Sequence, residues 1–289
     1  MTSETDTTDI RLGLIGDNIA RSRSPLLHVE AGRLCGLRVS YERLVPADMG
    51  LPFDAVFERC RQGGFHGINV TYPYKEQVVP LVRIDAAVVS RMGACNTVLF
   101  SGNDAEGFNT DYSGFVTAYR SVFGERETGT VAMAGAGGVG KAIAFALAAL
   151  ECSRVRLYDP NTERATALAQ SIGAADTGMV VEVCGSIGEA ADGADGLVNC
   201  TPLGMAGQPG TAVPAALMDN AAWAFDAVYT PVETEFLERA RATNLEVMSG
   251  YELYFHQGVD AFRLFTGRQV DQTALRGVLA MRETERVHP

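Results

Sequence analysis

Apolar and polar positions along this chain alternate between two patterns, that of short buried strands and that of amphipathic helices. Residues 10–16, IRLGLIG, are nearly all apolar and end in glycine, which is typical of a buried strand. Residues 24–37 have helical apolar spacing, and Ser24 followed by Pro25 predicts a helix that Ser24 caps. Strand, helix and strand patterns then recur in residues 39–47, 52–64 and 66–72. This order predicts an α/β domain with a parallel sheet and crossover helices.

A second α/β block follows a polar boundary. Residues 107–123 predict a helix that begins near Asn109 or Asp111, either of which caps helices well. The polar segment 124–129 separates this helix from the apolar segment 130–150, where the pattern changes at once. We therefore expect a first domain, a second domain and a C-terminal helical segment that packs back on the first domain, over residues 1–112, 113–246 and 247–289.

A glycine-rich loop lies at the start of the second block. Its residues satisfy the pattern GxGxxG and are Gly135, Ala136, Gly137, Gly138, Val139 and Gly140. With 31 glycines in the chain the match alone is weak, but the loop follows an apolar strand and opens an apolar helix. Glycines allow a tight turn and the close approach of a pyrophosphate, whose charge meets the N–H groups of the helix N-terminus. The loop therefore predicts a Rossmann-type doubly wound dinucleotide-binding domain, with a merely structural turn as the alternative.

Asp159 indicates which dinucleotide is bound. It ends the next predicted strand, where an acid accepts hydrogen bonds from the ribose hydroxyls of NAD and repels the 2′-phosphate of NADP. Residues 160–162 carry no cation, and Arg164 lies in the next helical turn. NAD is therefore favoured over NADP, and a role of Asp159 as the cap of the following helix is compatible with this prediction.

Composition and charge restrict the partners. A net charge of −11 and an isoelectric point near 4.9 argue against nucleic acid, which requires a basic surface, and favour a small-molecule partner. The six cysteines show neither metal-binding nor disulfide spacing. No apolar run reaches the ~18 residues of a membrane span, and the polar start MTSETDTTD lacks the features of a secretory signal. The sequence thus predicts a cytoplasmic protein without membrane contact, either a monomer or a homodimer.

Polar residues gather where the strands of the first domain end. Asn69 and Thr71 precede Lys75, and Asn96 and Asp111 follow in later segments of the same kind. Ligands of α/β proteins bind at such strand ends. A nicotinamide cofactor moves a hydride, so the substrate hydroxyl also exchanges a proton, which a lysine beside a carboxylate can carry. We therefore expect Lys75 and Asp111 to form a proton-transfer pair; a solvated lysine and a helix cap are the alternatives.

Short motifs follow one another along nearly the whole chain: RSRSPLLH, NVTYPYK, GACNT, NTD, GAGGVG, NCTPLGM, DAVYTPVET and HQGVDAF. In sequence and in order they resemble those of the shikimate/quinate dehydrogenase family. The resemblance implies an NAD-dependent oxidation of shikimate, and of quinate, to the 3-dehydro ketone, together with the reverse reaction. It implies no metal ion.

The resemblance also implies roles for individual residues. The implied substrate-binding residues are Ser22, Ser24, Asn69, Thr71, Asn96, Tyr229 and Gln257. Ser22 and Ser24 hold the ring carboxylate with Tyr229 nearby. Asn96 and Asp111 bind ring hydroxyls, and Gln257 closes over the ring. Lys75 and Asp111 are the implied catalytic pair. The implied cofactor-binding residues are the glycine loop, Asp159, Thr201 and Gly250.

Two features of the sequence leave more than one ring acid as the candidate substrate. Ser24 stands where family members that accept quinate well often carry threonine, which favours shikimate. Residues 250–256, GYELYFH, replace a usually apolar stretch, and the two tyrosines and the glutamate in it either shape the pocket or face solvent. Two alternative functions therefore remain. One is a dehydrogenase of a modified ring acid, such as an amino analogue, and the other is a non-catalytic sensor of NAD and a ring acid.

Overall fold

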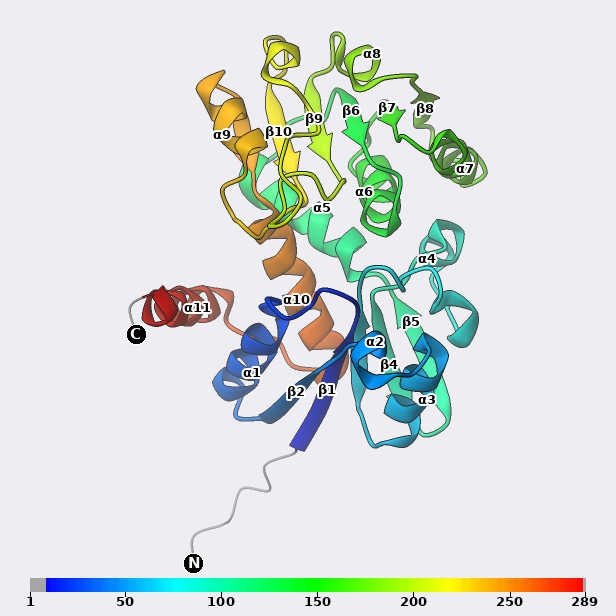
Figure 1. Cartoon of the computed structure of the whole chain (residues 1–289), viewed down its shortest axis with the longest axis vertical. Helices are drawn as coiled ribbons and strands as arrows, with labels where there is room; N and C mark the ends of the chain where they lie inside the picture. Colours follow the sequence, from blue (N-terminus) through cyan, green and yellow to red (C-terminus); the bar gives the residue numbers. More distant parts are fainter. Residues whose placement is uncertain (1–8, 288–289) are drawn as a thin grey trace, which may run out of the picture. The chain divides into compact units, whose positions relative to one another are not determined.

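The computed structural model describes residues 9–287, with side chains as far as Arg282. The start of the chain, MTSETDTTD, which we expect to lack a secretory signal, lies outside these residues except for Asp9. The described chain forms two compact units (Figure 1). Unit 1 consists of the residues up to Asp85, Ala94–Thr110 and the residues from Gly258 onward, and unit 2 consists of Ala86–Gly93 and Asp111–Gln257. The domain limits expected from the sequence differ from these units at three places. Residues 86–93 and 111–112, which include Asp111, belong to unit 2, and the return to unit 1 begins at Gly258 and not at residue 247.

Unit 1 is built on a five-stranded sheet in the order β2-β1-β3-β4-β5. Its strands are β1 Asp9–Ile15, β2 Arg38–Leu44, β3 Gly67–Val70, β4 Thr97–Ser101 and β5 Asp104–Phe108. The first three strands pair in parallel, as the pattern of residues 10–72 predicts, whereas β4 is antiparallel to both β3 and β5. The reason is a hairpin. Gly102 and Asn103 form a two-residue loop, with Gly102 at φ +60°, and such a loop joins only antiparallel strands.

Alternate residues of β1 point to two apolar clusters. Ile10 and Leu12 pack with Ala261 and Phe265 of α10, whereas Ile15 belongs to a second cluster with side chains of α3. The helical elements of unit 1 are α1 Ser24–Leu34, α2 Pro46–Met49, α3 Phe53–Gln62, the 3₁₀ turn η1 Val79–Leu81, the second half of α10 Gly250–Thr266, and α11 Gln272–Val287. The sheet of unit 1 therefore has apolar cover on both faces.

Unit 2 is built on six parallel strands in the order β11-β10-β9-β6-β7-β8. The strands are β6 Thr130–Ala134, β7 Arg154–Tyr158, β8 Val180–Val183, β9 Gly196–Asn199, β10 Trp223–Asp226 and β11 Glu246–Met248. The helical elements are α4 Ala87–Met92, α5 Thr110–Phe123, α6 Gly138–Ala149, α7 Thr162–Gly173, α8 Ile187–Ala191, η2 Ala215–Leu217, α9 Glu235–Ala242 and the first half of α10. This strand order is the doubly wound one, so the predicted α/β class with a Rossmann-type sheet is confirmed. No helix of the described chain combines the length and the apolar character that a bilayer crossing requires.

Helix α5 is held against strand β10 by aromatic rings. Phe115 meets Phe225 nearly edge-on at a centroid distance of 5.0 Å, and Tyr119 meets Trp223 in the same way at 5.2 Å. All four side chains are buried. Such pairs contribute ~0.5–1.5 kcal/mol each beyond their burial. The first turn of α5, which carries Asp111, therefore has a defined position in unit 2.

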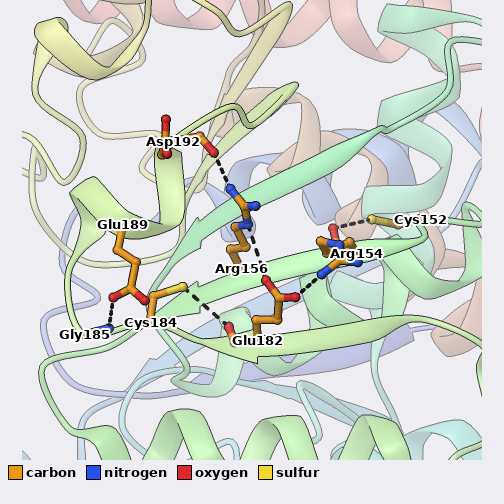
Figure 2. Close-up of polar contacts among 8 residues, drawn as sticks. All are labelled: Cys152, Arg154, Arg156, Glu182, Cys184, Gly185, Glu189 and Asp192. Atoms are coloured by element: carbon orange, nitrogen blue, oxygen red, sulfur yellow. Dashed lines mark hydrogen bonds and ion pairs between the residues drawn. The ribbon is translucent and has the colours of Figure 1, made fainter.

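An ion-pair cluster secures the edge strand β8 (Figure 2). Glu182 lies opposite Arg156 in the register of β7 and β8, and the Arg156 Nε to Glu182 Oε2 distance is 3.4 Å. Arg154 pairs with the other oxygen of Glu182, and Arg156 also donates to the backbone oxygen of Asp192. The charges are partly exposed and contribute at most about 1 kcal/mol each. On an edge strand they also disfavour pairing with a strand of another chain.

All six cysteines lie within the described residues, and each is a free thiol. Five of them are buried. Burial raises the pKa of the Cys60 thiol to about 12, which keeps it neutral and unreactive. The cysteines therefore act as small packing residues, in agreement with their spacing in the sequence.

Candidate active site

A buried network of side-chain hydrogen bonds joins the ends of β3 and β4 in unit 1. Asn69 Nδ2 donates to Thr97 Oγ1 at 3.0 Å and to the backbone oxygen of Asn96 at 3.3 Å. Asn96 Oδ1 accepts from the backbone N–H of Thr110 at 2.7 Å and from the Thr97 hydroxyl at 3.0 Å, while Asn96 Nδ2 donates to Thr110 Oγ1 at 3.0 Å. All four side chains are buried. The network therefore fixes two predicted substrate-binding amides in one orientation.

Two residues outside the predicted set support this network from behind. The Tyr41 hydroxyl, on β2, donates to Asn69 Oδ1 at 2.8 Å. The Tyr41 ring stacks on His28 at a centroid distance of 5.0 Å and an interplanar angle of 13°. Burial lowers the pKa of His28 to about 3, so its ring is neutral, and its Nδ1 has no hydrogen-bond partner among the described residues. No local spacing marks Tyr41 in the sequence, because its partners come from other strands and from α1.

The loop that carries Lys75 is held at two points. The Tyr74 ring stacks on Phe53 at 4.7 Å and 10°, and the Tyr74 hydroxyl donates to Asp17 at 3.0 Å. The backbone oxygen of Lys75 itself accepts from the N–H of Cys95 at 2.8 Å. Lys75 is half-buried and lies in a turn, and not at the start of a helix. A lysine on such a braced turn has a defined backbone position.

Thr71 lies just before this turn, against the end of β1. A Cβ at Gly16 would come within 2.3 Å of the Thr71 methyl group. The close approach explains why glycine stands at Gly16. The Thr71 side chain, just after β3, therefore packs directly against the backbone of Gly16.

Ser22 and Ser24 lie together at the N-terminus of α1. Their hydroxyl oxygens are 3.2 Å apart, and the backbone N–H of Ser24 donates to Ser22 Oγ at 3.3 Å. The prediction that Ser24 caps α1 is wrong, because the N-cap position is held by Arg23 without a side-chain bond and Ser24 is the first helical residue. The hydroxyl of Ser22, two residues earlier, accepts the backbone N–H of Ser24. Two hydroxyls at a helix N-terminus form a suitable environment for a carboxylate.

The glycine loop of unit 2 has the geometry that a dinucleotide requires. Gly135 has φ +100°, and a Cβ there would lie 2.8 Å from the backbone of Cys200. A Cβ at Gly140 would lie 2.2 Å from the backbone oxygen of Gly135. A Cβ at Gly137, by contrast, would meet no atom within 4 Å. The first and last glycines therefore serve the turn and the packing of α6, and Gly137 leaves open space at the helix N-terminus for a phosphate group.

Asp159 is hydrogen-bonded across this loop. Its Oδ2 accepts from the backbone N–H of Ala136 at 2.8 Å, and its Oδ1 accepts from the N–H of Asn161 at 2.8 Å. Asn161 is the N-cap of α7, since its side chain accepts from the Arg164 N–H. The alternative in which Asp159 caps that helix is therefore wrong, and the carboxylate belongs to the loop. Pro160, the next residue, supplies no cation for a 2′-phosphate.

A buried carboxylate that the sequence analysis does not predict, Asp226, secures the end of β10. It accepts hydrogen bonds from Asn199 Nδ2 at 2.9 Å, from the Val228 N–H at 3.0 Å and from the Thr234 hydroxyl at 2.6 Å. Burial raises its pKa to about 6 in spite of these bonds. Asn199 also accepts from the hydroxyl of Thr201 at 2.7 Å, so one network spans the ends of β9 and β10. Both Asp226 and Thr234 lie in the motif DAVYTPVET, but their contact arises only in the fold.

Three more predicted residues lie close together within unit 2. A Cβ at Gly114 would come within 2.6 Å of the backbone nitrogen of Gln257, so α5 and α10 cross closely at this point. Asp111 is buried in the first turn of α5, one turn before Gly114. Gln257 Nε2 donates to the backbone oxygen of Tyr254 at 2.9 Å, and the ring of Tyr254 stacks on that of Tyr229. The crossing therefore links Asp111, Gln257 and Tyr229.

Gly250 has a packing role that the predicted cofactor contact does not require. A Cβ there would lie 2.5 Å from the backbone oxygen of Val228 and 2.7 Å from that of Ala227. Only glycine allows α10 to begin this close to the loop after β10. Whether Gly250 also contacts the cofactor stays a prediction.

The predicted residues divide between the two units. Unit 1 contains Ser22, Ser24, Asn69, Thr71, Lys75 and Asn96, and unit 2 contains Asp111, Tyr229, Gln257, Thr201, Gly250, Asp159 and the glycine loop. Their individual roles toward substrate and cofactor stay predictions. Each unit nevertheless gathers its own set at the ends of its strands and at helix N-termini, where ligands of α/β proteins bind.

Comparison with known proteins agrees with this arrangement. Residues 14–98 match the family described as the shikimate dehydrogenase substrate binding domain. A quinate/shikimate dehydrogenase (NAD(+)) of Corynebacterium efficiens is 38% identical over 274 residues, which cover 92% of this chain and 96% of that protein. A shikimate dehydrogenase (NADP(+)) of Streptomyces avermitilis is 38% identical over 276 residues, which cover 93% and 94% of the two chains.

A solved structure of similar fold carries a dinucleotide. The quinate dehydrogenase from Corynebacterium glutamicum in complex with NAD has a TM-score of 0.86 to this chain at 36% identity, with coverage of 95% of this chain and 100% of that one. Identity and coverage of this extent, over both units, establish the family that the motifs indicate. The chain belongs to the shikimate/quinate dehydrogenase family.

Proposed function

We propose that this protein oxidises the ring hydroxyl of shikimate, and of quinate, to the 3-dehydro ketone with NAD, and catalyses the reverse reduction. The observation that carries the proposal is the hydrogen bond between Asp159 and Ala136 across a glycine loop that is open at Gly137. This arrangement accepts the diphosphate and the ribose of NAD. The similar proteins from Corynebacterium, whose names include quinate and NAD, support the same reaction.

NAD fits the residues of unit 2. Its pyrophosphate is held at Gly137 and the N-terminus of α6, where backbone N–H groups and the helix dipole favour an anion. Asp159 accepts hydrogen bonds from the adenosine ribose, and its negative charge disfavours the extra phosphate of NADP. When bound, NAD takes up a hydride from the substrate carbon that bears the reacting hydroxyl.

The polar groups of unit 1 fit a hydroxylated ring acid. Ser22 and Ser24 donate their hydroxyl hydrogens to the ring carboxylate, which the N-terminus of α1 further stabilises. Asn96, whose orientation is set by Thr97 and Thr110, meets a ring hydroxyl. Neutral donors of this kind allow a protein of net charge −11 to bind an anion without a basic pocket.

Lys75 and Asp111 move the proton of the reacting hydroxyl. The Lys75 amine takes this proton as the carbon–oxygen bond becomes a carbonyl, and returns it in the reverse reaction. Asp111 accepts a hydrogen bond from a ring hydroxyl. Support for the pair comes from the braced turn around Lys75 and from the hydrogen bonds between Thr110 and Asn96, which anchor the residue that precedes Asp111.

Replacement of Lys75 tests this function against the alternatives. Lys75→Ala should lower kcat by about 10²- to 10⁴-fold, the usual contribution of a positioned acid or base, with NAD affinity unchanged in calorimetry. Gln77→Ala, at an exposed position two residues further on, is the matched control and should keep the kcat of the parent protein.

Other outcomes would point elsewhere. A Lys75→Ala variant that keeps kcat within a factor of about three would contradict the role of the lysine. A parent protein that binds NAD and a ring acid but turns neither over would be the sensor. Turnover confined to an amino analogue would identify the modified ring acid as the substrate.

A further inference from the structure

The segment before Gln257 departs from the apolar pattern of the family, and the structure resolves what its tyrosines do. The side chain of Tyr254 is only 5% exposed. Its ring stacks on that of Tyr229 at a centroid distance of 5.1 Å and an interplanar angle of 10°. The ring of Tyr251, which is half-buried, lies at a centroid distance of 5.6 Å from that of Tyr254, with an interplanar angle of 49°. Tyr254 therefore points into unit 2 and not into solvent.

The stack joins a loop residue to a helix residue. Tyr229 follows β10 in an irregular loop, where a phenol side chain has several rotamers open to it. Tyr254 lies in the second turn of α10, whose start is packed on the same loop through Gly250 and the backbone oxygen of Val228. Parallel, offset rings are a favoured aromatic geometry. The helix thus restricts the ring of Tyr229 to one orientation.

Tyr254 also holds the amide of Gln257. Its backbone oxygen accepts a hydrogen bond from Gln257 Nε2 at 2.9 Å. One residue thereby sets two side chains that are expected to meet the ring acid, Tyr229 through its ring and Gln257 through its main chain. A change of the Tyr254 side chain removes only the first of these two effects.

We propose that Tyr254 is a positioning residue, which holds the Tyr229 hydroxyl as a hydrogen-bond donor toward the carboxylate of the ring acid. This inference rests on the proposed function. Tyr254 takes no part in hydride or proton transfer, so it sets the KM of the acid and leaves kcat and the KM of NAD unchanged. An apolar side chain in its place removes the ring stack on Tyr229.

Two substitutions at position 254 separate the ring from the hydroxyl. Tyr254→Leu removes the stack and should raise the KM of shikimate about two- to tenfold, the range that an aromatic pair contributes. Tyr254→Phe keeps the stack and should restore the KM of the parent protein. If Tyr254→Leu does not fold, Tyr254→Met provides an apolar chain of adaptable shape for the same comparison. The KM of NAD serves as the internal control in each variant.

The same substitution in a Tyr229→Phe background tests whether Tyr254 acts through the Tyr229 hydroxyl. Tyr229→Phe alone should raise the KM of shikimate, and adding Tyr254→Leu should then raise it by less than about twofold more, because the group being positioned is already gone. Full additivity of the two effects would overturn the inference. An unchanged KM in Tyr254→Leu, or a KM of Tyr254→Phe as high as that of Tyr254→Leu, would overturn it as well.

Calorimetric titration of shikimate into the NAD-loaded protein distinguishes the failure of this inference from that of the proposed function. If the parent protein binds shikimate without turnover, the proposed reaction fails, and the Kd values of the same variants replace KM in the comparison. If it binds neither shikimate nor quinate, the proposed function and the inference both fall. Turnover by the parent protein with equal KM values in all variants would overturn the inference alone.

Discussion

The carboxylate of Asp159 and the backbone N–H of Ala136 are joined by a hydrogen bond of 2.8 Å. The bond ties the end of β7 to the glycine loop after β6, the neighbouring strand in the sheet. The other oxygen of Asp159 accepts from the N–H of Asn161 at 2.8 Å, so two backbone groups set the orientation of this acid. The side chain that we propose as the determinant of cofactor preference is therefore preorganised by its own loop.

Replacement of Asp159 should weaken the preference for NAD. In Asp159→Asn the KM of NAD should rise about 10- to 100-fold, because hydrogen bonds to a charged group contribute about 1.5–3 kcal/mol. The KM of NADP should fall, because a negative charge no longer opposes the 2′-phosphate. Steady-state kinetics with both cofactors gives the ratio of the two kcat/KM values.

Glu163→Gln controls for the change in net charge, since Glu163 is an exposed acid in the first turn of α7. It should leave the ratio of NAD to NADP unchanged. Equal shifts in Asp159→Asn and Glu163→Gln would contradict the assignment.

Two glycines of the loop should respond in opposite ways to alanine. A Cβ at Gly137 would face open space, so Gly137→Ala should keep the stability of the parent protein but raise the KM of NAD by obstructing the phosphate. A Cβ at Gly140 would lie 2.2 Å from the backbone oxygen of Gly135, so Gly140→Ala should destabilise the fold by about 2 kcal/mol or more. Urea unfolding and NAD kinetics of the two variants provide the comparison. A Gly137→Ala variant with unaltered NAD kinetics would speak against a phosphate at this glycine.

The Tyr41 hydroxyl should stabilise unit 1 more than an outer hydroxyl does. In Tyr41→Phe the Oδ1 of the buried Asn69 loses the hydrogen bond from the Tyr41 hydroxyl. The free energy of unfolding should therefore fall by about 1–2 kcal/mol. Tyr74→Phe, whose partner Asp17 is only half-buried, is the matched control and should cost under about 1 kcal/mol. Chemical unfolding at constant m-value measures both. A larger loss in the free energy of unfolding in Tyr74→Phe than in Tyr41→Phe would contradict the idea that the Tyr41 hydroxyl stabilises the Asn69 network.

Asp226 should make the stability of the protein depend on pH. Burial raises its pKa from 3.8 to about 6 in the folded state, so the folded protein holds a proton that the unfolded chain releases. The resulting stability is fully present below pH 3.8 and is lost as the pH rises through about 6. A shift of this size corresponds to roughly 2–3 kcal/mol.

Asp226→Asn removes this titration and keeps the shape of the side chain. The free energy of unfolding of the parent protein minus that of Asp226→Asn should therefore decrease between pH 4 and pH 7, by roughly 2–3 kcal/mol. Thermal and urea unfolding across this range give the difference, in which the other carboxylates cancel. A difference that stays constant or increases with pH would contradict the raised pKa.

Local spacing in the sequence predicts those parts of the fold and the site that consist of neighbouring residues. The glycine loop lies within six consecutive residues, and Asp159 ends the next strand, so strand and helix periodicity predicts both the Rossmann-type order and the preference for NAD. The motif around Lys75 is equally local. These features survive in the structure because each depends on a single turn or strand end.

Features that depend on which groups meet in the folded chain escaped prediction. Ser24 is a good capping residue by type, yet Ser22 accepts its N–H and the cap position shifts to Arg23. Strand β5 spans only five residues, and a two-residue loop folds it onto β4. The bonds of Asp226 to Asn199 and Thr234 and the stack of Tyr229 on Tyr254 each join residues that only the folded sheet brings together.

The most direct test of the proposed function is the absorbance of reduced nicotinamide when the purified protein is mixed with NAD or NADP and with shikimate or quinate, in all four combinations. We expect turnover of both acids with NAD, and a much lower kcat/KM with NADP. Absence of turnover in all four combinations, by a protein that still binds NAD, would contradict it.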